Sequence, residues 1–387
     1  MINKIWSIVY NNDKKSLSGL NVTSYKNDTK KYSKNPQSTI KLISNNVESV
    51  LQNYGNFCEK TSISASYVAN VYRANILIQP NDNIVNYNNL IRYIWQTYGP
   101  TDELLSHFNI FMTKDISNNH NSARIWLIGM MCLLEKKKFD ECINIFHKYH
   151  NNFGTAFVHQ YLPLSNFLYK NGIETSRIER SSNIYEIMVK SKNKYMKYIE
   201  NKSFAVVGNA PSIIGKKFGK DIDSHDVIIR FNNYKIQNYS DDVGIKTNIW
   251  ARNMLVDETN YAAKRCEYII FEPNIWRFYI WDKAIENLYN YVTQYCVPVV
   301  NLDNRDELVS MLDGFPTTGL LVIHNLFKNR FRLKNVDLYG FTLDQTDNMG
   351  IGAHYFNKND VNLISSLHHN LNKEAKTIKT MLESWNK

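Results

Sequence analysis

Five residues that could hold a polar ligand stand at the ends of two apolar, strand-like runs in the middle of the chain. They are Gly208, Asn209, Ala210, Arg230 and Asn232. A glycine lets the backbone approach a ligand closely, and an asparagine side chain offers two donors and one acceptor. A tight turn alone would explain the glycine but neither the asparagines nor the arginine. Because ligands lie at the carboxyl ends of the strands in parallel sheets, the pattern predicts a binding site here.

The two common phosphate-binding loops do not fit this segment. Gly208 is followed by Asn-Ala-Pro, so the G-x-G-x-x-G pattern of dinucleotide-binding proteins is absent. Gly215 comes two positions too late for a P-loop, and neither Ser nor Thr follows Lys216. A dehydrogenase and a P-loop NTPase are therefore disfavoured.

A second polar group opens a predicted helix further along the chain. Thr317, Thr318 and Gly319 lead into the apolar sequence LLVIHNLF. Backbone N–H groups at a helix N-terminus have no partner within the helix, so they suit a phosphate or a carboxylate. His324 lies on the apolar face of this helix, where a hydrogen-bonded core histidine is expected.

The elements before residue 200 are predicted to be helices. Six apolar residues recur with helical spacing: Ala123, Trp126, Leu127, Met130, Met131 and Leu134. The spacing resumes over residues 139–146 after a run of lysines, which predicts a helical hairpin. One such pair resembles a tetratricopeptide unit, but no second copy follows at a fixed period. A Lys-rich helix is predicted over residues 183–201.

Strand-like and helical runs alternate from there on. The strand-like runs cover residues 204–207, 226–231, 247–251, 268–272, 297–302 and 336–341. This alternation predicts a parallel sheet with helices on both faces. We therefore expect an α/β, Rossmann-like nucleotide-binding domain over 196–387, after a mainly helical region over 1–195 whose part 90–195 holds the hairpin.

The amino-acid composition limits which binding partners and which cellular compartment are expected for this protein. The net charge of +10 fits nucleic acid in principle, but the lysines are spread along the chain without a compact basic block, so no nucleic-acid partner is expected. An anionic small substrate or an acidic membrane surface fits the charge equally well. Five scattered cysteines without a C-x-x-C pair indicate reduced core residues, neither disulfides nor a zinc site. With no apolar run near ~18 residues and a poor signal sequence, we expect a cytoplasmic protein, with peripheral contact at the inner membrane.

Four blocks resemble the motifs of the eukaryotic-type sialyltransferase family. Residues 204–233 are similar to its large motif, with an AVVGN strand, a G…G…ID-x-HD segment and a V-I-I-R-F-N end. Pro316–Phe341 resembles the small motif, Ala353–Phe356 the short His-Tyr motif, and the H-x-x-x-x-E step from His369 to Glu374 the last motif. Because the four blocks keep the family's order, the chain is identified as a member of this family. The resemblance implies the family's fold, which has a single nucleotide-binding domain. We expect a bacterial member.

The resemblance implies an inverting glycosyltransferase that needs neither a metal nor another cofactor. Its donor would be a CMP-activated keto-sugar acid and its acceptor a glycan. Asn209 and Asn232 would bracket the donor through its ribose and phosphate. CMP is already a good leaving group, so the reaction needs a base on the acceptor hydroxyl and a donor to the departing phosphate.

Histidine suits both roles, because its pKa lies near neutrality. By motif position, His369 would be the general base, although His368 beside it could serve chemically. His354 would donate to the phosphate of CMP, with Tyr355 next to it. Glu374 is expected to brace a helix.

This sequence departs from the family pattern at several positions. Phe204 stands where the large motif opens with a cysteine, so the family's bridge between the large and small motifs cannot form. Ala210-Pro211-Ser212 replaces the usual Ser-Gly-Asn, and the helical region before residue 200 lies outside the resemblance.

Other polar residues near the motifs have less specific readings. The D-x-D at Asp221–Asp223 precedes a strand, so a polar loop is expected there and not a metal site. His225 is expected to brace this loop. Arg252 and Arg277 could meet the carboxylate of the donor.

Two alternatives to sialyl transfer stay open. Kdo is also a CMP-activated keto acid, so a Kdo transferase with the same mechanism fits the same motifs. A helical scaffold whose C-terminal domain binds a nucleotide without catalysis is the alternative from another class. Acceptor, linkage and oligomeric state are not specified by the sequence.

Overall fold

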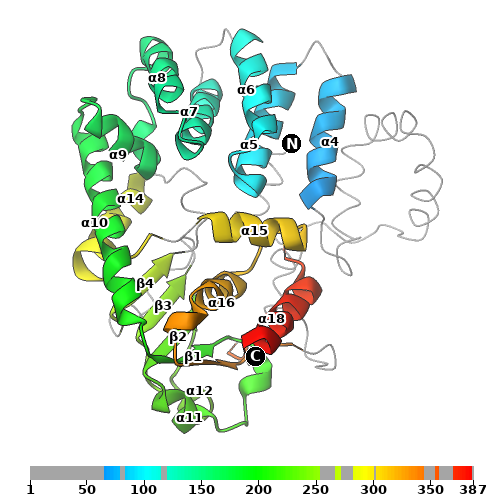
Figure 1. The fold of residues 1–387 in the computed structure, drawn as a ribbon, viewed down its shortest axis with the longest axis vertical. Helices are drawn as coiled ribbons and strands as arrows, with labels where there is room; N and C mark the ends of the chain where they lie inside the picture. Colours follow the sequence, from blue (N-terminus) through cyan, green and yellow to red (C-terminus); the bar gives the residue numbers. More distant parts are fainter. Residues whose placement is uncertain are drawn as a thin grey trace, which may run out of the picture.

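The computed structural model describes residues 65–78, 83–114, 120–252, 266–271, 282–299, 302–343, 354–356 and 369–385. Helices gather at one end of the molecule, and a sheet with its covering helices lies at the other (Figure 1). The long helix α10 (Ser176–Tyr198) runs from one part to the other. The parallel sheet flanked by helices confirms the predicted α/β class.

The described residues before the first strand form helices joined by turns. They are α4 (Ala65–Ile78), α5 (Asn83–Tyr98), α6 (Asp102–Lys114), α7 (His120–Glu135), α8 (Phe139–Phe153), the 3₁₀ turn η2 (Val158–Gln160), α9 (Leu162–Lys170) and α10. Consecutive helices from α4 to α8 pack against each other, as α9 does against α10. These helices form the mainly helical part of the chain.

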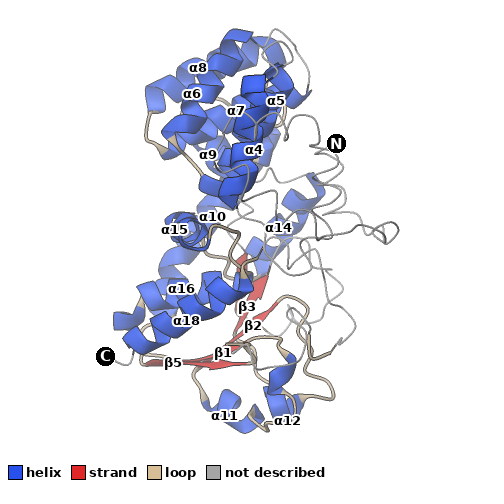
Figure 2. Cartoon of the chain, turned by 90° about the vertical axis from the view of Figure 1, so that its right-hand side faces the viewer, coloured by secondary structure: helices blue, strands red, loops and turns tan. Residues whose placement is uncertain are grey.

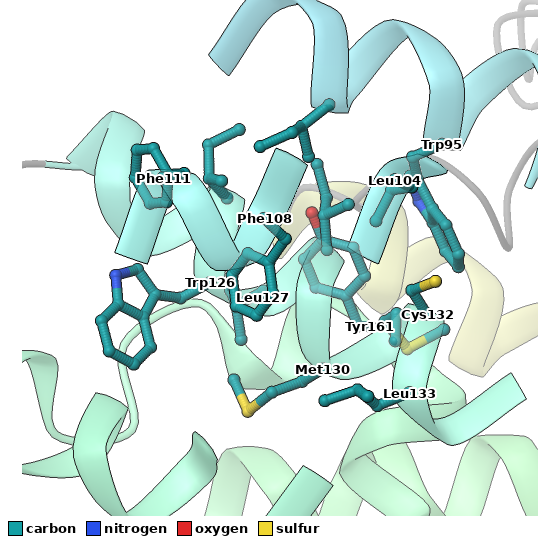
Figure 3. Packing of buried hydrophobic residues seen from close by; sticks show 14 of the residues in the cluster. Trp95, Leu104, Phe108, Phe111, Trp126, Leu127, Met130, Cys132, Leu133 and Tyr161 are labelled. Carbon is teal, nitrogen blue, oxygen red and sulfur yellow. The ribbon is translucent and has the colours of Figure 1, made fainter. Parts of the chain in front are cut away.

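The predicted helical hairpin is α7 and α8. Five of the six predicted apolar positions on α7 are buried, namely Ala123, Trp126, Leu127, Met130 and Met131. Figure 3 shows this face of α7 packed with Phe108 and Phe111 of α6. The lysine run forms the turn, with Lys137 in the left-handed conformation at φ 59°.

Within the described ranges, the second part holds a sheet of five parallel strands, in the order β4-β3-β2-β1-β5. Its strands are β1 (Ser203–Val207), β2 (Val227–Phe231), β3 (Ile249–Arg252), β4 (Tyr268–Phe271) and β5 (Asn335–Tyr339). Val207 pairs with Arg230 of β2 and with Tyr339 of β5. The carboxyl ends of β1, β2 and β5 therefore lie side by side at one edge.

Helices cover both faces of this sheet (Figure 2). One face packs under α15 (Leu302–Leu312), α16 (Thr318–Lys328) and α18 (Leu371–Trp385). The other face is covered by α11 (Gly219–Ser224), α12 (Ser240–Val243) and α14 (Asp282–Gln294). Phe204 and Val206 of β1 point to the first face, and Ala205 and Val207 point to the second.

The strand predicted over residues 297–302 is wrong. Cys296 makes an isolated bridge to Tyr268, and Leu302 already begins α15. Pro298 has no N–H to donate to a ladder, so the pairing does not continue. The apolar residue Val297 is nevertheless fully buried, which explains why the run looks like a strand.

The predicted boundary at 195/196 falls in the last turn of α10. This helix contributes to three apolar cores, through Ile178 to the helical part, Met188 to the α14 side of the sheet and Tyr195 to the α16 side. One helix is thus shared by the two parts, and no linker separates them there.

The cysteines that the structure describes are buried, apart from Cys296, which is half-buried. No disulfide joins any of Cys132, Cys142, Cys266 and Cys296, and Cys58 lies outside the described residues. Burial raises the pKa of the Cys142 and Cys266 thiols to about 12. Of the helices in the described ranges, none is both long and apolar enough to cross a membrane.

Candidate active site

The base of the site is the junction between the ends of β1 and β5. The N–H of Gly208 donates to Tyr339 O at 2.7 Å, and the N–H of Ala210 donates to Gly340 O at 2.9 Å. A Cβ atom on Gly208 would lie 2.4 Å from Gly340 O, closer than real contacts allow. Glycine is therefore required at 208 by the neighbouring backbone, whatever ligand binds above it.

Asn209 links the end of β1 to the end of β2. Its Nδ2 donates to Phe231 O at 3.1 Å, whereas its Oδ1 is buried without a hydrogen-bond partner in the described structure. A buried oxygen of this kind costs free energy unless something donates to it. The amide nitrogen of Asn209 is thus used by the fold, whereas its buried oxygen has no partner in the described structure; its contact with a donor stays a prediction.

The backbone conformation at position 232 favours an asparagine there. Its φ of 47° is left-handed, a region that asparagine tolerates better than most residues. Its N–H donates to Ala251 O at 2.9 Å, and its carbonyl accepts from Trp250 Nε1 at 2.9 Å. The backbone is therefore fixed at the end of β2, next to Asn209.

The His354–Phe356 segment docks on the same edge. The N–H of Tyr355 donates to Asn209 O at 2.9 Å, which places His354 beside the first strand end. The imidazole of His354 stacks on the ring of Phe356, with centroids 5.2 Å apart. The short motif is thus next to the large one, although the two are far apart in sequence.

Tyr355 itself braces the fold and does not reach toward a ligand. Its side chain is buried, and its hydroxyl accepts from Lys235 N at 2.9 Å and donates to Lys235 O. Burial raises the pKa of this phenol to about 12. The hydroxyl of Tyr355, predicted to lie near the donor, instead joins its own segment to the backbone of Lys235.

Arg230 is also committed within the protein. It is 1% exposed, and its guanidinium donates to Val243 O at 2.6 Å, Lys246 O at 3.0 Å and Thr247 Oγ1 at 3.1 Å. Its side chain points to the α11–α12 face, away from the strand end. The predicted role in substrate binding does not fit this geometry, because these bonds hold the end of α12 and the loop before β3.

Arg252 at the end of β3 is enclosed by aromatic rings. Its guanidinium lies 4.3 Å from the ring centroid of Trp250, and its Nη1 donates to Tyr291 Oη at 2.7 Å. Arg252 is 1% exposed, so its guanidinium packs inside the protein at the end of β3. Arg277, the other candidate for the donor's carboxylate, lies outside the described residues.

Thr317 caps α16 and is held by a buried carboxylate. Its Oγ1 accepts from Leu320 N, while its N–H and hydroxyl donate to Glu374 Oε1 and Oε2 at 2.9 and 2.7 Å. Glu374 is 4% exposed, so it braces the helix start, as predicted. The hydroxyl of Thr317 is used up, which leaves the N–H groups of Thr318 and Gly319 at the head of the helix.

His369 is anchored through one ring nitrogen. Its Nδ1 lies 2.7 Å from Phe315 O and 4.0 Å from Glu374 Oε1. A carbonyl can only accept, so Nδ1 carries the proton and Nε2 keeps its lone pair. Burial lowers the pKa of His369, and the bond to Phe315 opposes this in part. The lowered pKa favours the neutral ring with a free lone pair on Nε2. His368 lies outside the described residues.

Phe341, which the motif analysis did not single out, lies between the end of β1 and the start of α16. Its ring lies 3.1 Å from where a Cβ of Gly208 would stand and 3.0 Å from where a Cβ of Gly319 would stand. Two glycines thus give one aromatic ring room between β1 and α16. The ring connects the Asn209 side of the site to the Thr317, Glu374 and His369 side.

The D-x-D segment and His225 lie in and directly after α11, which covers one face of the sheet. Asp223 accepts two backbone N–H groups, and Asp221 Oδ2 accepts from Tyr339 Oη at 2.6 Å. The ring of His225 bonds Asp337 Oδ2 at 2.8 Å and Asp221 O at 3.0 Å. Asp221 and Asp223 both lie in the short helix α11 and not in a loop, and His225 braces this segment, as expected.

Residues 147–269 match the family model of glycosyltransferase family 29 (sialyltransferase). The match begins inside α8 and ends in β4, so it includes α9 and α10, which the motifs alone had left out. Gly208, Asn209 and Asn232 lie within the matched residues. The chain therefore contains a sialyltransferase-type region.

Known proteins resemble this chain over limited stretches. It is 29% identical over 145 residues to the sialyltransferase-like protein 2 of Arabidopsis thaliana, covering 36% of this chain and 30% of that protein. It is 45% identical over 47 residues to a β-1,6-galactosyltransferase of Arabidopsis thaliana, covering 12% of each. The chain thus spans less than a third of the length of either relative.

A solved structure of a mammalian sialyltransferase in complex with Gal-beta-1-3GalNAc-ortho-nitrophenol is also similar. It is 19% identical, with a TM-score of 0.39, and the alignment covers 53% of this chain and 76% of that one.

Proposed function

We propose that this protein is an inverting, metal-independent glycosyltransferase that moves a sialic acid from CMP-sialic acid to a hydroxyl group of a glycan. The sialyltransferase-type region supports the reaction class. The observation that carries the proposal is the bond from His369 Nδ1 to Phe315 O at 2.7 Å. This bond leaves Nε2 unprotonated, and we take it as the base that acts on a ligand bound at the carboxyl ends of the strands.

The reaction proceeds by one displacement. Nε2 of His369 takes the proton of the acceptor hydroxyl as its oxygen bonds to the anomeric carbon of the sugar. The bond from that carbon to the phosphate oxygen breaks, and CMP leaves with both electrons of that bond. Glu374, 4.0 Å from Nδ1, favours the positive charge that the ring then acquires.

In this proposal the donor is held by groups at the ends of two strands, at the start of one helix and in the His354–Phe356 segment. The orphan Oδ1 of Asn209 accepts a ribose hydroxyl, next to the fixed turn of Asn232. The N–H groups of Thr318 and Gly319 face an anionic group, although the Glu374 carboxylate already partly neutralises this helix end. His354 donates to the departing phosphate.

The donor is tested by incubating the protein with CMP-sialic acid, CMP-Kdo and a nucleotide-activated galactose, each with a galactosyl acceptor. Release of CMP from CMP-sialic acid, unchanged by EDTA, is the expected result. Turnover of CMP-Kdo alone would reassign the sugar, and turnover of the galactose donor would favour the activity named for the Arabidopsis relative. CMP binding without any turnover would support the non-catalytic scaffold instead.

We propose a bacterial surface polysaccharide or lipooligosaccharide as the acceptor and the cytoplasm as the compartment. Phe204, fully buried, replaces the cysteine of the large motif, and the described cysteines form no disulfide. A protein of a reducing compartment has no use for that bridge.

A basic patch around Phe331 fits peripheral contact with an anionic membrane. Phe331 is 88% exposed between Arg330 and Arg332, and Arg330 lies 4.3 Å from its ring centroid. The patch lies just before the amino end of β5, whereas the candidate site is built at the carboxyl ends of the strands. Arg332 pairs with Glu200 at 2.9 Å, so Arg330 is the cation beside the exposed ring, and such a ring suits the headgroup region.

This contact is measured by co-sedimentation with vesicles of phosphatidylglycerol and of phosphatidylcholine. We expect binding to the anionic vesicles alone. Arg330→Gln should weaken it about fivefold, because one basic residue contributes ~1 kcal/mol at such a surface. Lys379→Gln, on α18, is the matched control for loss of charge. Equal binding to both vesicles, or to neither, would contradict the contact.

A further inference from the structure

The loop between α15 and α16 carries the carbonyl that orients His369. This loop, residues 313–317, ends at the cap of α16 and contains Phe315, whose carbonyl accepts the proton of His369 Nδ1. One side of the loop is held by α18. Lys373 Nζ donates to Leu312 O at 3.0 Å, and Glu374 holds Thr317. The other side is held by the helical part of the chain.

Asp313 joins the loop to the start of α4. Its backbone carbonyl accepts from Ala65 N at 2.9 Å, its Oδ1 accepts from Ser66 N at 2.8 Å, and its Oδ2 accepts from Ser66 Oγ at 2.8 Å. Ala65 and Ser66 are the first residues of α4, so a carboxylate caps its positive end. Asp313 has a left-handed φ of 49°, which holds only where the surroundings fix it.

Arg305 joins the same region to the end of α5. The side chain is fully buried, and it donates from Nη1 to Thr97 O at 3.2 Å and from Nη2 to Gln96 O. These are carbonyls of the last turn of α5, where a cation is favourable. The same guanidinium lies 5.6 Å from the ring centroid of Phe315. Arg305 therefore connects α5 to the residue that orients His369.

Figure 1 shows α15 lying across the ends of α4 and α5, between the helical part and the sheet. Helices α4 and α5 pack side by side, so the start of one and the end of the other reach the loop together. The loop is thus clamped by charged groups at two helix ends and by α18.

We propose that α4 and α5 are a positioning element of the active site. Through Asp313 and Arg305 they fix the Phe315 carbonyl, and through it the tautomer and orientation of His369. This inference rests on the proposed function only in taking His369 as the base. It gives the helical part of the chain a role in catalysis, with Asp313 and Arg305 as positioning residues.

The test uses the full chain with Asp313→Gly, because glycine tolerates the positive φ and removes only the capping carboxylate. The tautomer of His369 is read from ¹⁵N shifts of the labelled histidine rings, assigned with His369→Asn. We expect the wild type to hold the Nδ1–H form and the variant to show a mixture of tautomers. We also expect kcat to fall on the order of 10²-fold with the KM of the donor unchanged, the effect of a small misplacement of a catalytic group.

Two controls separate positioning from general destabilisation. Thr175→Ala removes a similar cap, from the N-terminus of α10, where Thr175 Oγ1 accepts from Ile178 N at 3.3 Å. It should lower the melting temperature without moving the tautomer of His369. Asp313→Asn keeps an acceptor for Ser66 N and the left-handed backbone, so it should restore most of the kcat.

The proposal is overturned if Asp313→Gly keeps the Nδ1–H form and a kcat within twofold of the wild type. It is also overturned if Thr175→Ala moves both readouts equally. Should Asp313→Gly fail to fold, Ser66→Ala, which removes only the hydroxyl bond, is expected to lower kcat several-fold and to shift the tautomer in the same direction; no change in either overturns the proposal. If no donor turns over, the proposed function fails, but the tautomer still decides whether the clamp orients His369.

Discussion

Replacement of His369 by asparagine is expected to lower the rate of sugar transfer by about 10²–10⁴-fold while CMP binding is largely kept, which is the usual contribution of a general base. The amide nitrogen of asparagine can take the place of Nδ1 and still donate to Phe315 O, which His369 contacts at 2.7 Å. It has nothing in the place of Nε2. The substitution therefore removes the base and keeps the anchor. Transfer is measured as CMP release and binding as the heat of CMP titration.

His225 provides the matched control histidine. It bonds Asp337 and Asp221 on the far side of the sheet edge, so His225→Asn should cost stability and leave transfer per folded molecule close to the wild type. Retention of more than a tenth of the wild-type rate in His369→Asn would show that His369 is not the base. Loss of activity in His368→Asn in that case would assign the role to its neighbour.

The pH dependence of the rate gives the same prediction a second readout. Burial lowers the pKa of His369, so the neutral form persists below the ordinary imidazole value of about 6.5. As the pH falls through the lowered pKa, a proton occupies Nε2 and kcat/KM declines. The acidic limb of the profile should therefore lie below about pH 6.5, and it should be missing from the residual activity of His369→Asn.

Much of the fold could be predicted because its signals are local. The alternation of strand-like and helical runs located all five strands that the structure describes, and the spacing on α7 located its buried face. The prediction of a strand over 297–302 was wrong because an apolar residue can be buried without pairing in a sheet. Val297 is buried without a strand, and Pro298 removes the donor that a strand would need.

The site was less predictable, because a motif names residues but not the direction of their side chains. Arg230 and Tyr355 stand at motif positions, and the side chains of both donate to backbone carbonyls elsewhere in the protein. The bond that anchors the His369 ring ends on a carbonyl oxygen, which every residue has, so no residue type at 315 could reveal it. Asp313 and Arg305 were missed for the same reason, since most of their partners are backbone groups at helix ends.

Gly208→Ala is expected to damage both the fold and the donor site. The added Cβ would lie 2.4 Å from Gly340 O and 3.1 Å from Gly340 C, which belong to the backbone and cannot rotate away. Either β1 and β5 separate at their ends, or the turn through Asn209 shifts. Overpacking of this kind costs about 1–3 kcal/mol, so the free energy of unfolding in urea should fall by that amount.

The same clash should also weaken CMP binding, which distinguishes it from a simple loss of stability. Asn209 Nδ2 is tied to the end of β2, so a shifted turn moves the orphan Oδ1 out of place. Gly215→Asn is the control, because Gly215 has a left-handed φ of 79° and nothing within 4 Å of an added Cβ. It should cost little in stability and nothing in CMP affinity. If Gly208→Ala unfolds like the wild type and binds CMP equally well, then β1 and β5 do not meet as closely as the hydrogen bonds from Gly208 and Ala210 require, and the cradle must be built from other residues.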